Sequence, residues 1–159
     1  MDEIAKNDCL KLERESDLKE CQVQKFLEKV DTDFPTSLSQ KTDLHEFAIK
    51  LKNYATLCAL TNENGILSLV AGYTKNTVNN MAYISIVATV NECRGKGYAK
   101  LLLNEFVEKC FSKNLNAIHL YTAKSNIGAI KLYEKFGFIE YHIKNEERPN
   151  DIHLIYYLK

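Results

Sequence analysis

Apolar residues recur every three or four positions in four stretches of the chain, which is the spacing of an amphipathic helix. The first pattern begins at Ser16-Asp17 and is ended by Phe34-Pro35-Thr36. Thr42 or Asp43 is placed to cap the second helix, and Gly137 is placed to end the last one. The other predicted helices run from Thr42 to Lys52, from Gly97 to Phe111 and from Ile127 to Phe136.

Short apolar runs bounded by polar turns predict strands between these helices, and hence an α/β (α+β) fold. Three consecutive runs are separated only by polar turns, so we expect an antiparallel meander. The last run alternates apolar and polar residues, as a half-exposed edge strand or a hairpin would. The predicted strands are Cys9–Glu13, Tyr54–Leu60, Ile66–Tyr73, Met81–Val90, Ala117–Tyr121, Phe138–Ile143 and Ile152–Leu158.

Length and composition narrow the class of protein. A chain of 159 residues fits one domain over residues 1–159 with one core. An apolar fraction of 45% with 26% charged residues excludes a disordered or collagen-like chain. Lys plus Arg equal Asp plus Glu at 21 each, so we expect no general attraction to nucleic acid or to an anionic membrane. Any phosphate binding must therefore be local.

The cysteines and the N-terminal residues bear on the cellular compartment. The five cysteines are odd in number, widely spaced and without a C-x-x-C pair, so we expect reduced thiols and a cytoplasmic protein. Residues 1–8 are acidic and polar, and no apolar run approaches the roughly 18 residues that span a bilayer. Neither secretion nor membrane insertion is expected.

The segment Val87–Leu102 passes from a predicted strand through glycines into a predicted helix. Such a loop exposes backbone N–H groups at the positive end of the helix dipole, which favours anion binding. Gly95 and Gly97 let an oxygen-rich ligand approach the backbone, and Arg94 and Lys96 add positive charge. The pattern favours a bound pyrophosphate, with a plain connecting turn as the alternative.

The spacing of this loop is neither that of a nucleotide-hydrolysing phosphate loop, G-x-x-x-x-G-K-[ST], nor that of the dinucleotide fingerprint G-x-G-x-x-G. ATP and NAD are therefore disfavoured. A second segment, Asn126–Phe138, reads N-I-G-A-I-K-L-Y-E-K-F-G-F and lies on the predicted helix that follows the fifth strand.

Together the two segments resemble the GNAT superfamily of acyl-CoA N-acyltransferases. They stand in the order and at the separation of that family, and the predicted elements from Cys9 to Leu158 follow its architecture. The family's usual Val-x-Pro ahead of the loop appears here as Val90-Asn91, without proline. The R-x-x-G-x-A/G signature is matched by Arg94, Gly97 and Ala99, and the N-x-x-A-x-x-x-Y-x-x-x-G-F pattern by Asn126, Ala129, Tyr133, Gly137 and Phe138.

The resemblance implies a three-layer fold in which a mixed, mostly antiparallel sheet of about seven strands splays between strands four and five, flanked by about four helices. Acetyl-CoA is implied as co-substrate in that gap, with its pantetheine arm on the fourth strand and its pyrophosphate on the loop. The residues implied in binding it are Val87, Ala88, Thr89, Val90, Arg94, Gly95, Lys96, Gly97, Tyr98, Ala99, Asn126 and Tyr133.

Tyr133 is implied as the catalytic residue that protonates the departing CoA thiolate. A phenol of pKa near 10 stays protonated at neutral pH and can donate to a thiolate of pKa about 8.5. The alternative is a core aromatic on an apolar stripe. The reaction would be direct transfer to an amine, with neither a metal nor a covalent enzyme intermediate, and Cys93 beside the loop is interpreted as packing rather than as a nucleophile.

A general base is harder to assign, because the predicted strand Met81–Val90 contains no carboxylate. Tyr83, Ser85, His119 and Glu46 are candidates, and a chain of water molecules is equally suitable. His119 lies between apolar residues, so a hydrogen-bonded, partly buried histidine is the alternative account of it. The remaining histidines show no metal-ligand spacing.

The acceptor is expected to be a small-molecule amine, bound through residues that include Phe34, Tyr83 and Ser85. The polar stretch Asp31–Ser39, with Tyr73 and Tyr141, suits an amino sugar, free or nucleotide-linked. Peptide N-termini, polyamines, amino acids and aminoglycosides stay open, and the oligomeric state is monomer or homodimer. A non-catalytic acyl-CoA sensor and a protein-binding module are the rival classes; the presence of Tyr133 favours catalysis, and the glycine loop argues against the module.

Overall fold

A seven-stranded sheet of order β1-β2-β3-β4-β5-β7-β6 forms the centre of the protein. The structure is a computed structural model that describes residues 10–142 and 147–159. Neighbouring strands are antiparallel except β4 and β5, which are parallel. The strands are β1 (Lys11–Glu13), β2 (Thr56–Asn62), β3 (Gly65–Tyr73), β4 (Met81–Thr89), β5 (Ala117–Ala123), β6 (Ile139–Glu140) and β7 (Asp151–Tyr157).

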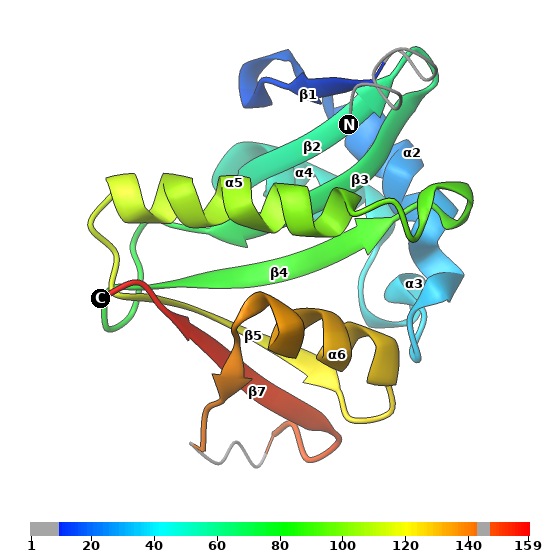
Figure 1. Cartoon of the computed structure of the whole chain (residues 1–159). Helices are drawn as coiled ribbons and strands as arrows, with labels where there is room; N and C mark the ends of the chain where they lie inside the picture. Colours follow the sequence, from blue (N-terminus) through cyan, green and yellow to red (C-terminus); the bar gives the residue numbers. More distant parts are fainter. Residues whose placement is uncertain (1–9, 143–146) are drawn as a thin grey trace.

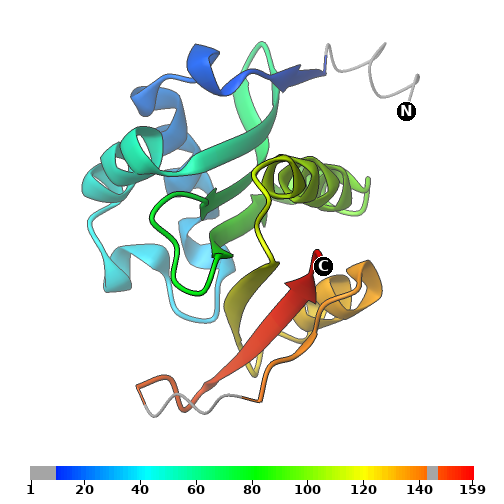
Figure 2. The ribbon, with the colours of Figure 1, turned by 90° about the vertical axis from the view of Figure 1, so that its left-hand side faces the viewer.

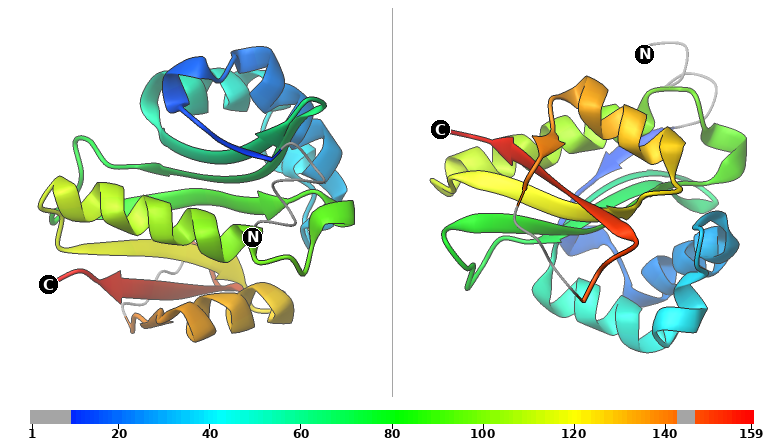
Figure 3. Two further views of the ribbon diagram at one scale, coloured as in Figure 1. Left: turned by 45° about the horizontal axis from the view of Figure 1, so that its top comes forward. Right: turned by 90° about the horizontal axis from the view of Figure 1, so that it is seen from below.

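Helices cover both faces of the sheet (Figure 3). In the view from below, α5 and α6 lie on one side of the strands, and α2, α3 and α4 lie on the other. Figure 2 shows β5 and β7 side by side with α6 against one of their faces. The helices are α2 (Glu20–Val30), α3 (Leu38–Lys41), α4 (Leu44–Tyr54), α5 (Tyr98–Ser112) and α6 (Ile127–Phe136). This architecture confirms the expected fold class.

The sheet splits between β4 and β5, as expected (Figure 1). The two strands pair only through Met81 with Ala117, Ala82 with Ile118 and Tyr83 with His119. After Tyr83 they diverge, while β4 continues to pair with β3 as far as Thr89. Each backbone group of β4 that points into the split therefore faces an opening rather than a partner strand.

Close packing at Gly72 sets the position of α5 on the meander. The register between β3 and β4 shifts between Ala71 and Gly72. A Cβ on Gly72 would lie 2.6 Å from the Phe106 ring and 2.7 Å from the Tyr83 carbonyl oxygen. Phe106 of α5 is fully buried at this contact. Only glycine lets the helix and both strands approach so closely.

Two sequence predictions of element boundaries need correction. The first helix begins at Glu20 rather than Ser16, because Lys19 is extended and its N–H donates to Gln22 Oε1 at 2.8 Å. Residues 15–17 form a 3₁₀ turn instead, in which the Glu15 carboxylate accepts a hydrogen bond from the Leu57 N–H. Tyr54 ends α4 rather than beginning a strand.

The C-terminal hairpin also differs in part. The last strand, β7, forms the expected hairpin with β6 but also pairs along its whole length with β5, so it is not an edge strand. On one face of β7, Tyr156 packs against Phe136 of α6, with 5.4 Å between ring centroids, while on the other face His153 stacks on Tyr121 of β5 at 4.1 Å. The predicted Cys9 and Ile143 lie outside the described residues. Nowhere in residues 10–142 and 147–159 is a helix long and apolar enough to cross a membrane.

Candidate functional site

Two adjoining cavities lie along the split edge of β4. The first, called the loop cleft, has a volume of about 460 Å³ and runs beside the start of α5. Most of the predicted cofactor residues line it: Val87, Ala88, Thr89, Arg94, Gly95, Gly97, Tyr98, Ala99 and Asn126. Val90 and Lys96 do not; Val90 is buried and its N–H donates to the Leu67 carbonyl at 2.9 Å.

The backbone of the loop supports an anion site. Gly95 and Gly97 have φ angles of 78° and 81°, and a Cβ on either would meet nothing within 4 Å. Both glycines are therefore needed for backbone conformation and for an open approach, not for packing. The first backbone bond of α5 runs from the Leu101 N–H to the Gly97 carbonyl at 3.1 Å. The amides that precede Leu101 have no acceptor within the helix, at the positive end of its dipole.

Arg94 links this loop to the connection between α2 and α3. Its guanidinium lies 2.8 Å from the Asp33 carboxylate, and its Nε donates to the Thr89 carbonyl at 3.3 Å. Asp33 belongs to the 3₁₀ turn η2 (Asp31–Asp33), which directly precedes Phe34. The ion pair is partly exposed, so its contribution to stability is modest. It nevertheless fixes Phe34 beside the loop.

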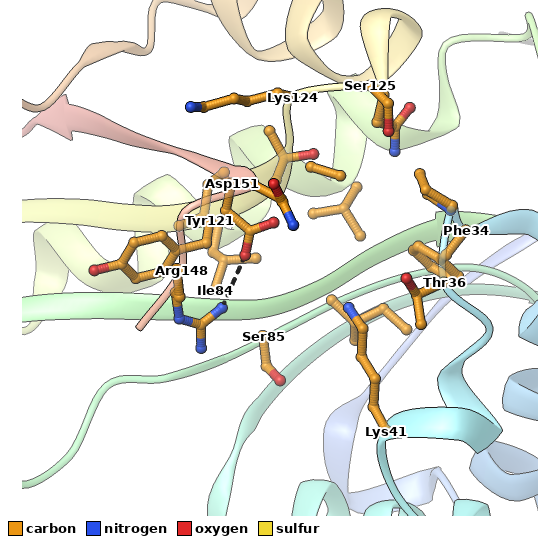
Figure 4. A pocket seen from close by; sticks show the side chains of 18 of the residues that line it. Phe34, Thr36, Lys41, Ile84, Ser85, Tyr121, Lys124, Ser125, Arg148 and Asp151 are labelled. Carbon is orange, nitrogen blue, oxygen red and sulfur yellow. Dashed lines mark hydrogen bonds and ion pairs between the residues drawn. The ribbon is translucent and has the colours of Figure 1, made fainter. Parts of the chain in front are cut away.

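The second cavity, called the split cavity, has a volume of about 570 Å³ and lies between the diverging β4 and β5 (Figure 4). Phe34, Val87 and Asn126 line both cavities, so the two spaces meet at these residues. The three residues predicted for the acceptor, Phe34, Tyr83 and Ser85, all line the split cavity. The structure therefore brings most of the predicted cofactor and acceptor residues together from three separate chain segments.

Tyr133 also lines the split cavity. It projects from α6, whose first turn is capped by Asn126 Oδ1 accepting from the Ala129 N–H at 3.3 Å. The ring is 7% exposed and stands edge-on to Phe138, with 5.6 Å between ring centroids. Burial raises the pKa of the Tyr133 phenol above its ordinary value near 10. Tyr133 therefore carries its proton throughout the neutral range.

The candidates for the general base differ in whether they line the split cavity. Tyr83 and Ser85 line the split cavity, whereas Glu46 is exposed on α4 and lines neither cavity. His119 Nδ1 lies 2.8 Å from His153 Nε2, as a hydrogen-bonded, partly buried histidine would. Burial, and next the charge of His153, lowers the pKa of His119 to about 4. His119 is thus a weak base behind Tyr83, with 5.1 Å between their ring centroids.

Sequence reasoning missed four charged residues of the split cavity: Lys41, Lys124, Arg148 and Asp151. The Arg148 Nη1 lies 3.3 Å from the Asp151 carboxylate, and its guanidinium carbon lies 4.3 Å from the centre of the Tyr121 ring. The available signal was the polar run before the last strand, a segment that forms part of the acceptor site in the family it resembles. No pattern in the sequence indicated that Lys41 or Lys124 would line this cavity.

In the described part of the chain, no cluster of side chains is arranged for metal binding or thiol chemistry. No group of three His, Cys, Asp or Glu side chains among residues 10–142 and 147–159 is arranged to hold a metal ion. Cys93 is buried beside the loop, and neither it nor Cys21, Cys58 or Cys110 forms a disulfide within the described residues.

Comparison with known proteins identifies the family. The model of the acetyltransferase (GNAT) family matches residues 22–138, which is most of the chain and includes both sequence motifs. The protein belongs to this family. That membership confirms the resemblance drawn from the sequence.

Individual relatives are more distant. Spermidine N(1)-acetyltransferase of Vibrio cholerae is 33% identical over 79 residues, a match that spans 49% of this chain and 45% of that protein. Among solved structures, Ard1 from Thermoplasma volcanium superposes with a TM-score of 0.74 at 15% identity, over 94% of this chain and 97% of that one. The PaiA N-acetyltransferase of Thermoplasma acidophilum, in complex with coenzyme A, superposes with a TM-score of 0.67 at 15% identity, over 93% of this chain and 97% of that one. These structures share the fold.

Proposed function

We propose that the protein transfers the acetyl group of acetyl-CoA directly to a primary amine of a small acceptor. The observation that carries this proposal is the junction of the two cavities at Phe34, Val87 and Asn126, with the protonated Tyr133 lining one of them. One cavity has the backbone geometry for a pyrophosphate, and the other has room for an acceptor. A thioester at the junction would be within reach of both an amine and a proton donor.

The residues present fit acetyl-CoA as the co-substrate. The pyrophosphate would be held by the amides of the loop between Arg94 and Ala99, at the start of α5. The pantetheine amides would pair with the edge of β4 between Val87 and Thr89, where no strand of the described chain pairs on the side of the split. Asn126 would contact the cofactor from the opposite wall. Acetyl-CoA supplies the activated acyl group.

The chemistry needs few protein groups. The neutral amine attacks the thioester carbonyl, and a β4 backbone N–H that faces the split stabilises the resulting oxyanion. On collapse, the carbon–sulfur bond breaks, Tyr133 gives its proton to the sulfur, and the new amide nitrogen loses its proton to water.

A buried phenol is a suitable donor for this sulfur. Burial raises the pKa of both the Cys58 and Cys110 thiols to about 12, which shows what exclusion of water does to a thiol in this protein. A CoA thiolate formed between β4 and β5 loses solvation in the same way. Loss of solvation raises the proton affinity of the sulfur, which favours proton transfer from Tyr133.

The acceptor and the compartment are also proposals. The hydroxyl groups of Tyr83, Ser85 and Thr36 in the split cavity support the amino sugar expected from the sequence, whereas the distant spermidine acetyltransferase relative supports a polyamine. Peptide N-termini are the further alternative. The four cysteines of the described chain, none of which forms a disulfide within it, support a cytoplasmic location.

The test is release of the CoA thiol from acetyl-CoA across a panel of amino sugars, polyamines, amino acids, aminoglycosides and short peptides. Turnover with one group supports the proposal and names the acceptor class. If every amine is inactive while acetyl-CoA still raises the melting temperature, the protein is an acyl-CoA sensor and the proposed reaction is wrong.

A further inference from the structure

The charged side chains around the split cavity are mostly cationic. Lys41, Lys124 and Arg148 line it, and Asp151 is its one carboxylate among the described residues. That carboxylate is already paired with Arg148. Neither lysine forms an ion pair within the described part of the chain. Three cations against one carboxylate leave an excess of positive charge around the space proposed for the acceptor.

The neighbouring η2 turn does not reverse this balance. The Asp33 carboxylate binds Arg94 at 2.8 Å, and Asp31 Oδ1 accepts a hydrogen bond from the Ser39 N–H at 2.7 Å. Both carboxylates next to Phe34 are therefore engaged away from the split cavity. An acceptor with several ammonium groups would find no unpaired carboxylate among the described lining residues.

The cations lie on opposite walls (Figure 4). Lys41 reaches from α3 toward the centre of the cavity, while Arg148 comes from the turn before β7 on the other side of Ser85. Lys124 lies along the rim above Asp151. An anionic group between Lys41 and Arg148 would contact cations from two elements.

Arg148 is held in place before any ligand binds. Its guanidinium packs over the Tyr121 ring at 4.3 Å, and one of its nitrogens binds Asp151. Burial raises the pKa of the Tyr83 phenol, and the charge of the nearby Arg148 guanidinium opposes this rise. Because a guanidinium has five N–H donors, these contacts leave donors for a ligand. Little side-chain entropy is then lost on binding an oxyanion.

From this arrangement we infer that the acceptor is an amine that also carries a carboxylate or phosphate group, which Arg148 and Lys41 bind, and that polyamines are excluded. The inference rests on the proposed acetyl transfer. The surrounding positive charge also disfavours the ammonium form of the acceptor amine. It therefore favours the neutral nucleophile, at a site whose described lining residues include no unpaired carboxylate. Among amino sugars, phosphorylated or nucleotide-linked ones satisfy this requirement and free ones do not.

The experiment compares acceptors that differ only in the anionic group. Glucosamine 6-phosphate is paired with glucosamine for phosphate, and glycine is paired with glycinamide for carboxylate, with spermidine as the polycation. The kcat/KM is expressed per neutral amine. We expect the anionic member of at least one pair to be preferred by about 10-fold or more, as a charge-assisted hydrogen bond provides. The pair that shows this preference identifies whether the site recognises phosphate or carboxylate.

Variants then test the assignment. Arg148→Gln should lower kcat/KM for the anionic acceptor by about 10- to 100-fold more than for its neutral partner. Arg148→Glu should shift the preference toward spermidine. Lys135→Gln, an exposed cation of α6 that lines neither cavity, is the control and should change nothing.

The outcomes separate this inference from the proposed function. Preference for spermidine or for the neutral member of both pairs overturns the inference and leaves acetyl transfer standing. An equal loss for anionic and neutral acceptors in Arg148→Gln overturns the role of Arg148. If no amine of any kind is acetylated, the proposed function fails and the inference fails with it.

Discussion

The Tyr133 hydroxyl has no hydrogen-bond partner among the described residues, although its ring is buried. Tyr133→Phe therefore leaves no buried polar group unpaired and should fold normally. We predict that it binds acetyl-CoA as tightly as the native protein but lowers kcat by about 10- to 10³-fold, the loss typical of a general acid. Steady-state kinetics with calorimetric titration of acetyl-CoA measures both quantities.

Tyr54→Phe is the matched control, because Tyr54 is 69% exposed on α4 and lines neither cavity. It should leave kcat unchanged. Because burial raises the pKa of Tyr133, its ionisation should cause no fall of kcat in the native protein below about pH 10. An unchanged kcat in Tyr133→Phe would remove this residue from the mechanism.

Gly97 allows a second test at one position. Its φ of 81° strains any side chain, but Asn and Asp are among the residues found most often at positive φ, and a Cβ there meets nothing within 4 Å. The two substitutions differ in charge but hardly in shape. We predict that Gly97→Asp weakens acetyl-CoA binding about 10-fold or more relative to Gly97→Asn, because its carboxylate repels the pyrophosphate. The difference should shrink at high salt. Equal affinities in a titration at low salt would mean that the phosphates lie elsewhere.

The site residues differ in how far sequence alone could identify them. Gly97 and Tyr133 were predictable because they stand at fixed offsets within continuous motifs. Arg148 and Lys41 were not, since single charged residues in polar turns look like solvated surface until folding places them on opposite walls of one cavity. His119 is hydrogen-bonded to His153, whereas Tyr83 lines the split cavity. This difference likewise depends on neighbours in adjacent strands, which local sequence does not show.

At the level of elements, the junction of β3, β4 and α5 depends on Gly72. A methyl group there would meet the Phe106 ring at 2.6 Å and the Tyr83 carbonyl at 2.7 Å. Gly72→Ala should lower the free energy of unfolding by about 1–3 kcal/mol, the cost of overpacking a buried contact. Urea unfolding measures this change.

Gly128→Ala is the matched comparison. Gly128 lies in α6, and a Cβ there meets nothing within 4 Å. Alanine should stabilise the helix by about 0.5 kcal/mol, because it restricts the unfolded chain. If both substitutions had the same effect on urea unfolding, the close approach at Gly72 would not be real.

The pairing of β5 with β7 predicts acid sensitivity. His119 and His153 are hydrogen-bonded across these strands, and burial lowers the pKa of both, that of His119 to about 4. Between that value and the unfolded pKa near 6.5, only the unfolded chain takes up the proton of His119. Stability is therefore fully present above about pH 6.5 and falls as the pH is lowered toward 4.

His119→Gln should remove about 1–2 kcal/mol of the stability that the native protein loses between pH 7 and pH 5, a value discounted because the site is only half-buried. Urea unfolding at the two pH values measures the difference. His142→Gln, at an exposed histidine that follows β6, is the matched control variant. If the free energy of unfolding of His119→Gln fell between pH 7 and pH 5 as much as that of the native protein, the proposed linkage would be wrong.

Elements with long periodic patterns were predictable, and short ones were not. The pattern from Ile127 to Phe136 predicted α6 correctly at both ends, because Asn126 and Gly137 are strong local caps. The four residues of α3 carry too little periodicity to be seen. The 3₁₀ turn ahead of α2 is joined to β2 by the Glu15 carboxylate, which accepts a hydrogen bond from the Leu57 N–H, 42 positions away, and no local pattern shows this contact.

In the whole molecule, two parts of the sheet are joined by a short seam. Strands β1 to β4 form one part and β5, β7 and β6 the other, while β4 and β5 pair through only three residue pairs. Beyond that seam, the edge of β4 faces the split, and α5 and α6 lie on the same face of the sheet across it (Figure 1). A ligand that pairs with β4 and touches α6 would bridge both parts.

We therefore predict that acetyl-CoA slows amide hydrogen exchange in residues 84–89 and 120–126 together, on both sides of the split. At about 100 times its Kd, it should also stabilise the fold by about 2.7 kcal/mol. The matched probe is adenosine 3′,5′-bisphosphate, which keeps two phosphates but lacks the pantetheine arm, and which should protect the start of α5 without protecting β4. If both ligands protected β4 equally, or if acetyl-CoA protected only α5, the split would not be the pantetheine site, and the junction of the two cavities would lose its proposed catalytic meaning.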